Sequence, residues 1–141
     1  MNLIGDIAAI CYPLPPPGSV TPADCYFDAC EQAERLRAEE AERLEAASDG
    51  LDADALLLAL EDAKARKAEA DAEIRRLLAY GREFHGARPY RLESLAQASG
   101  MTISGIRTAY GTSEIEEVEH AVRRKPNRRT VKSLAKEPHG Q

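Results

Sequence analysis

The chain has 141 residues, 43% of them hydrophobic and 5% aromatic. This length allows one modest globular core with elongated or flexible parts, and it excludes a large enzyme. The net charge of −5 would argue against a nucleic-acid partner if it were spread evenly, but residues 1–30 carry −3, residues 31–80 carry −6 and residues 81–141 carry +4.

The N-terminal apolar run, residues 3–11, is short, is interrupted by a glycine and an aspartate, and has no Lys or Arg before it. It therefore does not match a secretory signal. No segment approaches the roughly 20 apolar residues of a membrane span. The three cysteines, Cys11, Cys25 and Cys30, are odd in number and irregularly spaced. We expect free thiols, a cytoplasmic location and no membrane partner.

Residues 12–22 contain five of the eight prolines. Proline lacks the amide hydrogen that helices and sheets use, so an extended segment is predicted. It could be a polyproline ligand for an aromatic groove, but no flanking basic residue supports that, and a spacer or an arm packed on a neighbour is favoured. Because the preceding side chains are strongly apolar, residues 1–20 are predicted to form a proline-rich arm that docks on another surface.

Two long helices are predicted next. Thr21-Pro22 is typical of a helix start, since the hydroxyl can cap and proline suits the first turn, and this helix continues to Ser48. Asp49-Gly50 is expected to end it with a left-handed cap, and Asp52 to open a second helix over about 53–84. Their short connection predicts an antiparallel hairpin, residues 21–80.

Apolar residues of the second helix recur at alternating spacings of four and three, the heptad pattern of coiled coils. These positions are Leu56, Leu60, Ala63, Ala70, Ile74, Leu77 and Phe84, with Lys67 and Gly81 in the two gaps. Surplus leucine near the hairpin turn predicts that a second copy of the chain packs there. The predicted dimer residues are Leu56, Leu57, Leu58, Leu60 and Ile74. Alanine- and glutamate-rich helices also show such patterns as monomeric surface helices, so that alternative stays open.

The most informative pattern follows the break of the long helix at Gly86 and Pro89. Ala96 is followed four residues later by Gly100 and six after that by Ile106. A small residue lets two short helices cross closely, glycine can take the positive φ of a tight turn, and the isoleucine fills the core beneath them. The same spacing also occurs in ordinary helical hairpins of small α-domains.

The second short helix is predicted to begin at Thr102, whose hydroxyl would accept a hydrogen bond from an unpaired backbone amide. Its outward positions would be Ile103, Ser104, Arg107 and Thr108. Gly105 in mid-helix costs roughly 1 kcal/mol relative to alanine. It either permits close approach of the backbone to a phosphate or simply weakens the helix.

These residues, within 92–110, resemble the helix-turn-helix of small bacterial, actinobacterial-type DNA-binding proteins, here with an added coiled-coil segment. The resemblance implies an all-α fold, an antiparallel long-helix hairpin joined to a small helix-turn-helix domain at 81–124, whose second helix enters the major groove of double-stranded DNA. The DNA-binding residues would be Thr102, Ile103, Ser104, Arg107 and Thr108.

A last helix is predicted over 114–124, opened by a capping box of Ser113 and Glu116. Seven basic residues crowd into 123–136 with no acid among them, and a basic flexible tail is predicted at 125–141. The predicted phosphate contacts are Arg123, Arg124, Lys125, Arg128 and Arg129. Such contacts would strengthen binding by releasing counterions from DNA. The alternative is a solvated terminus that touches nothing.

Other chemistry has little support in the sequence. Neither the cysteines nor the three histidines show the spacing of a structural zinc site, and there is no nucleophile elbow or glycine-rich phosphate loop. We expect no enzyme, no cofactor and no metal. The function that fits best is a dimeric, sequence-specific transcriptional regulator of the repressor type, with Arg107 paired to guanine. The alternatives are a coiled-coil adaptor or antitoxin that binds a protein partner through the acidic helices, and an architectural DNA organiser.

Overall fold

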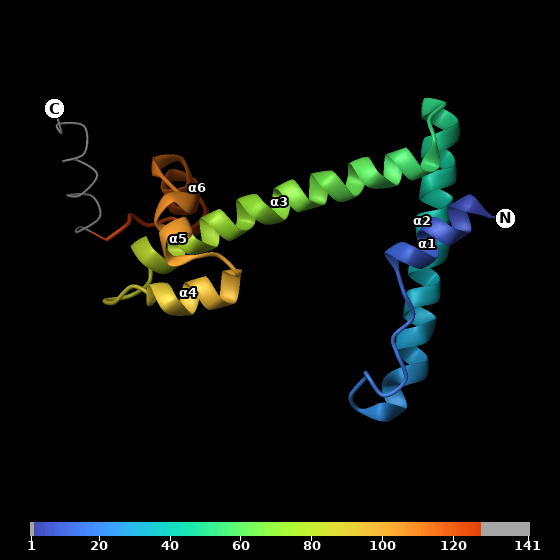
Figure 1. The fold of residues 1–141 in the computed structure, drawn as a ribbon, viewed down its shortest axis with the longest axis horizontal. Helices are drawn as coiled ribbons and strands as arrows, with labels where there is room; N and C mark the ends of the chain where they lie inside the picture. Colours follow the sequence, from blue (N-terminus) through green and yellow to red (C-terminus); the bar gives the residue numbers. More distant parts are fainter. Residues whose placement is uncertain (1, 128–141) are drawn as a thin grey trace. The chain divides into compact units, whose positions relative to one another are not determined.

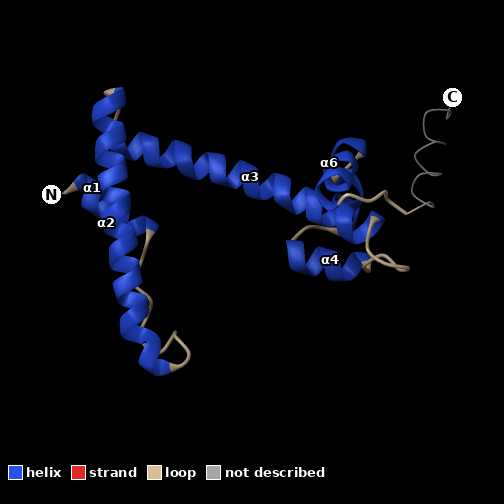
Figure 2. Ribbon diagram, turned by 180° about the vertical axis from the view of Figure 1, so that it is seen from behind, coloured by secondary structure: helices blue, strands red, loops and turns tan. Residues whose placement is uncertain are grey.

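A computed structural model of the chain describes residues 2–127, which form helices and loops without a strand (Figures 1 and 2). The elements are α1 (Leu3–Cys11), the 3-10 turn η1 (Ala23–Cys25), α2 (Tyr26–Leu51), α3 (Ala55–Glu83), α4 (Leu92–Ser99), α5 (Ile103–Ala109) and α6 (Thr112–Val122). The predicted all-α class is confirmed. None of the described helices is long and apolar enough to cross a membrane.

The contacts divide the chain into two units, with the boundary inside α3 between Arg66 and Lys67. The sequence predicted a division after residue 80 instead. The boundary lies earlier in the chain because the C-terminal half of α3 contributes side chains to the core of the second unit, whereas its first turns contribute to the first.

The first unit is built on α2, against which α1 packs. Asn2 caps α1, since its Oδ1 accepts a hydrogen bond from the amide of Gly5 at 3.0 Å. Ile7 of α1, Leu44 of α2 and Ala55 of α3 form one buried cluster. Ile4 and Ile7 therefore dock as expected, whereas Leu3 and Ile10 stay exposed. The segment is a helix, which was not predicted from the sequence.

The proline segment between α1 and α2 runs back along α2 (Figure 1). Tyr26 Oη donates to the carbonyl of Pro15 at 3.1 Å, and Arg37 Nε donates to the carbonyl of Tyr12 at 2.7 Å. The segment is not extended throughout, because the chain reverses in a hydrogen-bonded turn at Gly18, whose φ of 80° favours glycine. The surface on which this segment packs is thus α2 of its own chain.

The ends of the long helices differ from the predicted ones. Helix α2 begins after a 3-10 turn rather than at a Thr21 cap, and it continues through Gly50. The left-handed residue that ends it is Asp52, at φ 49°, a conformation that aspartate tolerates better than most side chains. Helix α3 is then capped by Asp54, whose Oδ1 accepts from the amide of Leu57 at 3.1 Å.

The antiparallel hairpin of α2 and α3 is not confirmed. In the first unit it is α1 that packs along α2, and α3 contributes one face of its first turns. The residues on this face, spaced as i, i+3, i+4 and i+7, are Ala55, Leu58, Ala59 and Asp62. The predicted seam positions Leu56 and Leu60 are 45% and 58% exposed. The face of α3 that packs on the first unit is thus formed by positions other than the seam positions. The seam itself stays exposed at Leu56 and Leu60.

The second unit contains the C-terminal half of α3 with α4, α5 and α6. Its core cluster joins the end of α3 to α6 through Ala79, Phe84, Ile115 and Val118. Gly81, a predicted seam position, is buried here, and a Cβ on it would lie 3.5 Å from the side chain of Leu95 in α4. Leu77, another predicted seam position, is 60% exposed. Helix α4 thus packs on α3 at Gly81, where a Cβ would make ordinary van der Waals contact with Leu95.

Helix α6 starts slightly earlier than predicted. Its N-terminal contact is made by Glu114, whose Oε2 accepts from the amide of Gly111 at 3.1 Å, and not by a Ser113–Glu116 pair. Val122 at its end is exposed rather than part of the core. The short loop after α5 accounts for the difference. It places the amide of Gly111 within reach of Glu114, the third residue of the helix.

The two phenylalanines of the chain provide a matched test of the second core. Phe84 is fully buried and Phe27 is 76% exposed. Phe84→Ala is expected to lower the free energy of unfolding of the second unit by about 3–5 kcal/mol, and Phe27→Ala to change stability by less than about 0.5 kcal/mol. Urea denaturation followed by circular dichroism measures the loss, and hydrogen exchange of α6 locates it. Equal losses in the two variants would contradict this core.

Candidate nucleic-acid interface

Helices α4 and α5 are joined by a short turn that begins at Gly100. Gly100 has a φ of 74° and its amide donates to the carbonyl of Ala96 at 2.9 Å, which closes α4. No atom lies within 4 Å of a Cβ placed on this glycine. Backbone conformation rather than space therefore selects glycine here, and the predicted positive φ is confirmed.

Thr102 caps α5 as predicted, because its Oγ1 accepts from the amide of Gly105 at 2.9 Å. A Cβ on Gly105 would lie 2.9 Å from that same Oγ1, closer than side chains tolerate. Glycine at position 105 thus leaves room for the Thr102 cap. This role of the glycine was not predicted from the sequence. Ile106, one position further, is fully buried beneath the helix pair.

The outward face of α5 is exposed. It comprises the predicted positions Thr102, Ile103, Ser104, Arg107 and Thr108. Thr108 Oγ1 donates to the carbonyl of Gly105 at 3.2 Å, and Thr102 Oγ1 lies 3.4 Å from Ser104 Oγ. The side chain of Arg107 makes no hydrogen bond or ion pair with any residue of the described range 2–127. Its guanidinium is therefore available to a ligand.

Two of the basic residues predicted to bind phosphate are engaged within the chain. Arg124 Nη1 donates to the carbonyl of Phe84 at 2.5 Å, Nη2 donates to Tyr80 Oη at 3.2 Å, and the guanidinium lies 5.6 Å from the Tyr80 ring centroid. Lys125 Nζ forms an ion pair with Glu119. These contacts fasten the segment after α6 to α3 and α6, so a phosphate would have to compete with them.

Arg123 is placed differently from its neighbours. It ends α6 in a left-handed conformation, at φ 58°, and its side chain is exposed without a hydrogen-bond or ion-pair partner among residues 2–127. Arg128 and Arg129 lie outside the described residues. Among residues 2–127, the predicted DNA-binding residues whose charged side chains form no bond within the chain are thus Arg107 and Arg123.

The support for α5 comes from contacts that are distant in sequence. Tyr110, directly after α5, donates its hydroxyl to Glu83 Oε1 at 2.7 Å. Burial raises the pKa of Tyr110, and the hydrogen bond to Glu83 adds to this effect. Arg76 of α3 also pairs with Glu117 of α6 at 3.4 Å. The exposed face of α5 is therefore presented by a helix whose end is fixed to α3.

The residues predicted for dimer contact all lie on α3. Leu56, Leu57 and Leu60 are exposed, and Ile74 is half-buried. Leu58, by contrast, packs half-buried against the core of the first unit, because it lies on the face that α3 turns toward α1 and α2. Four of the five predicted positions thus remain accessible on the single chain.

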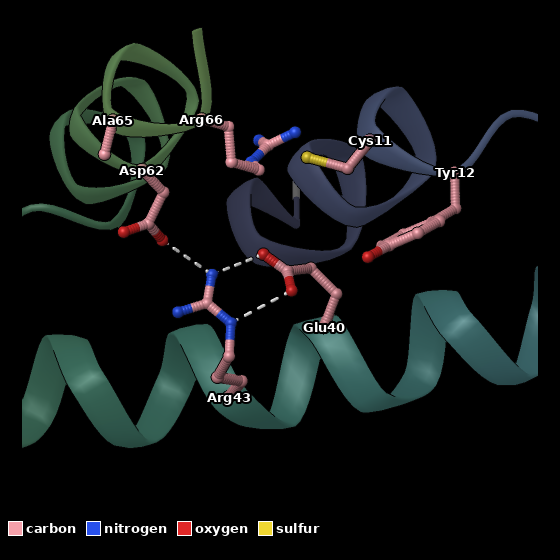
Figure 3. A pocket seen from close by; sticks show the side chains of 7 residues that line it. All are labelled: Cys11, Tyr12, Glu40, Arg43, Asp62, Ala65 and Arg66. Carbon is pink, nitrogen blue, oxygen red and sulfur yellow. Dashed lines mark hydrogen bonds and ion pairs between the residues drawn. The ribbon is translucent and has the colours of Figure 1, made fainter. Parts of the chain in front are cut away.

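A hollow in the first unit also collects polar side chains (Figure 3). Its volume is about 560 Å³ and it is lined by Cys11, Tyr12, Glu40, Arg43, Asp62, Ala65 and Arg66. Arg43 bridges the two carboxylates, with Nε 3.0 Å from Glu40 Oε2 and Nη2 2.8 Å from Asp62 Oδ2. The hydrogen bond to Glu40, opposed in part by desolvation, raises the pKa of Arg43. The two carboxylates of the hollow are thus both paired with Arg43.

No His, Cys, Asp and Glu cluster that could hold a metal occurs among residues 2–127. Comparison of the chain with protein-family models, with curated proteins and with solved structures finds no match. The function is therefore inferred from the side chains described above.

Arg124 and Arg123 allow a test of their separate roles. Arg124→Ala is expected to lower the stability of the second unit by about 1–2 kcal/mol, because it removes two hydrogen bonds from a charged group. Arg123→Ala is the matched control and should change stability by less than about 0.5 kcal/mol. Thermal and urea unfolding measure both. A destabilisation of equal size in the control would show that Arg124 does not anchor the chain.

Proposed function

We propose that the chain is a sequence-specific, DNA-binding transcriptional regulator of the repressor type that acts as a dimer. In this proposal α4 and α5 form a helix-turn-helix, and α5 enters the major groove. The observation that carries the proposal is the unpaired guanidinium of Arg107 on the exposed face of α5. An arginine left without an intrachain partner beside small hydroxyl side chains suits a polar ligand with a fixed pattern of acceptors.

The chemistry of the face matches the edges of bases. Arg107 would donate two hydrogen bonds to guanine O6 and N7, the commonest specific contact in the major groove. Ser104 and Thr108 would bond to adjacent bases, and Ile103 would contact a thymine methyl. Thr102, at the start of the helix, would lie nearest the phosphates. The arginine, serine, threonine and isoleucine side chains of this one short helix would together prefer particular bases and fix the orientation of the helix in the groove.

The distribution of charge supports the same partner. Residues 81–141 carry +4, whereas the preceding 80 residues are acidic. DNA phosphates would attract the second unit and repel the first, which orients the chain. Arg123 would bind a phosphate beside the groove, and we propose the same role for Arg128 and Arg129.

The length of α5 explains why a dimer is proposed. The helix has seven residues, which span about 10 Å, so one copy can read only a few base pairs. Two copies would place two such helices in successive major grooves about 34 Å apart and would double the number of contacts. A palindromic site is therefore expected.

Replacement of Arg107 tests the proposal. Sites would first be selected from random duplex DNA, and affinity would then be measured by fluorescence anisotropy on a selected and a scrambled duplex. Arg107→Ala is expected to lower affinity for the selected duplex by roughly 1–3 kcal/mol and to leave the scrambled duplex nearly unaffected. Arg75→Ala, which removes an exposed arginine of α3, is the control and should change neither.

The other outcomes separate the alternatives. An equal loss on both duplexes would indicate an architectural organiser that binds by charge. Absence of binding to any duplex at low salt would refute the DNA-binding proposal, and an adaptor or antitoxin acting on a protein partner would replace it.

The basic C-terminal segment generates a separate prediction. Truncation after Pro126 removes Arg128, Arg129, Lys132 and Lys136. The logarithmic slope of affinity against salt should become shallower by about 0.9 for each phosphate contact that is lost. Anisotropy titrations over a range of salt concentrations give the slope for the full and the truncated chain. An unchanged slope would show that these residues do not contact DNA.

A further inference from the structure

Helix α3 carries an apolar face that no described residue covers. The heptad positions between the two packed ends of the helix are Leu56, Leu60, Ala63, Lys67, Ala70, Ile74 and Leu77. All are exposed except Ile74, which is half-buried, and Leu60 and Leu77 are 58% and 60% exposed. The contacts of α3 with the rest of the chain lie beyond this stretch or on other faces, through Leu58 at one end and through Ala79 and the seam position Gly81 at the other.

The side chains of this face are complementary to a reversed copy of itself. When two α3 helices pair antiparallel, a heptad a position faces a d position of the other copy. In one register Leu60 faces Leu77, Ala63 faces Ile74, and Lys67 faces Ala70. The leucines at the two ends thus meet each other, Ile74 packs against the smaller Ala63, and Lys67 and Ala70 lie at the centre. The stem of Lys67 can cover alanine while its amine reaches water.

The same register pairs the charges that flank the face. Lys64 of one copy lies opposite Asp71 of the other, and Arg66 lies opposite Glu73, so two-fold symmetry gives four ion pairs. None of these four residues forms an ion pair with another residue of the described range 2–127, and all four are exposed. Flanking charges of this kind set partner choice and orientation in coiled coils.

A parallel pair of the same helices is less favourable. Lys67 would then face Lys67 of the second copy, which brings two like charges together at the centre of the interface. Arg66 would face Asp71, giving two ion pairs instead of four, while Lys64 would face Ala59. The charge pattern therefore favours the antiparallel arrangement.

From this complementarity we propose that α3 is a self-recognition surface, on which a second copy of the chain binds antiparallel with Leu60 opposite Leu77 and Lys64 opposite Asp71. The inference rests on the dimer of the proposed function and specifies its interface. It does not require DNA, so the association is measured without it. The interface is isologous, because each copy contributes the same surface.

Charge reversal in the full chain tests the register. The dissociation constant of the dimer is measured by sedimentation equilibrium for the unaltered chain, Lys64→Glu, Asp71→Lys and the double variant. Residues 64 and 71 are used because Arg66 also lines the hollow of the first unit. Each single reversal turns two attractive pairs into repulsive ones and should raise the dissociation constant about tenfold. The double variant should return to within about threefold of the unaltered chain.

Arg75→Glu is the control, since it changes the charge by the same amount on an exposed residue away from the seam. It should leave the dissociation constant nearly unchanged. Circular dichroism checks that every variant keeps its helix content.

The remaining outcomes would overturn the inference. A parallel dimer would weaken with Asp71→Lys, would tolerate Lys64→Glu, and would not recover in the double variant. A dimer indifferent to all three variants would have its interface elsewhere. A chain that remains monomeric at a concentration of 100 µM or above, with or without these substitutions, would refute self-recognition even if its specific binding to DNA were intact.

Discussion

The packing of side chains around Phe84 is the constraint on which the second unit depends. Phe84 is fully buried where α3 ends, and α6 covers it through Ile115 and Val118. Its ring stacks parallel to that of Tyr80, with centroids 6.3 Å apart, and its carbonyl accepts the hydrogen bond from Arg124. One residue therefore joins the end of a long helix, a later helix and the segment beyond it. Tyr110, the residue that follows α5, packs against the same cluster.

The parts of the fold that the sequence predicted are those determined by local chemistry. Gly100, Thr102 and Ile106 each act within a few residues of their own position, through backbone conformation, capping and the helical period. The signal is strong because few residue types satisfy each requirement. The exposed outer face of α5 follows directly from the burial of Ile106.

The parts that were missed depend on partners far along the chain. Tyr110 pairs with Glu83 and Arg124 with Phe84, contacts separated by 27 and 40 residues. No pattern in one sequence identifies such pairs, so Arg124 was indistinguishable from its exposed neighbour Arg123. The predicted antiparallel hairpin of α2 and α3 was not confirmed, for a related reason. A heptad pattern shows that a helix face is apolar, but it does not say whether the same chain or another one covers it.

The contact between Thr102 and Gly105 limits how α5 can change. Better helix formers at position 105 would stiffen the helix, but a Cβ there would lie 2.9 Å from Thr102 Oγ1, so the capping side chain would have to shift to admit it. The other exposed positions of α5, Ile103, Ser104, Arg107 and Thr108, do not supply the capping bond. Thr108 bonds only to backbone carbonyls, and Ser104 Oγ lies 3.4 Å from Thr102 Oγ1. The chemistry of this exposed surface can therefore be altered at those four positions while the bond between Thr102 and the amide of Gly105 is kept.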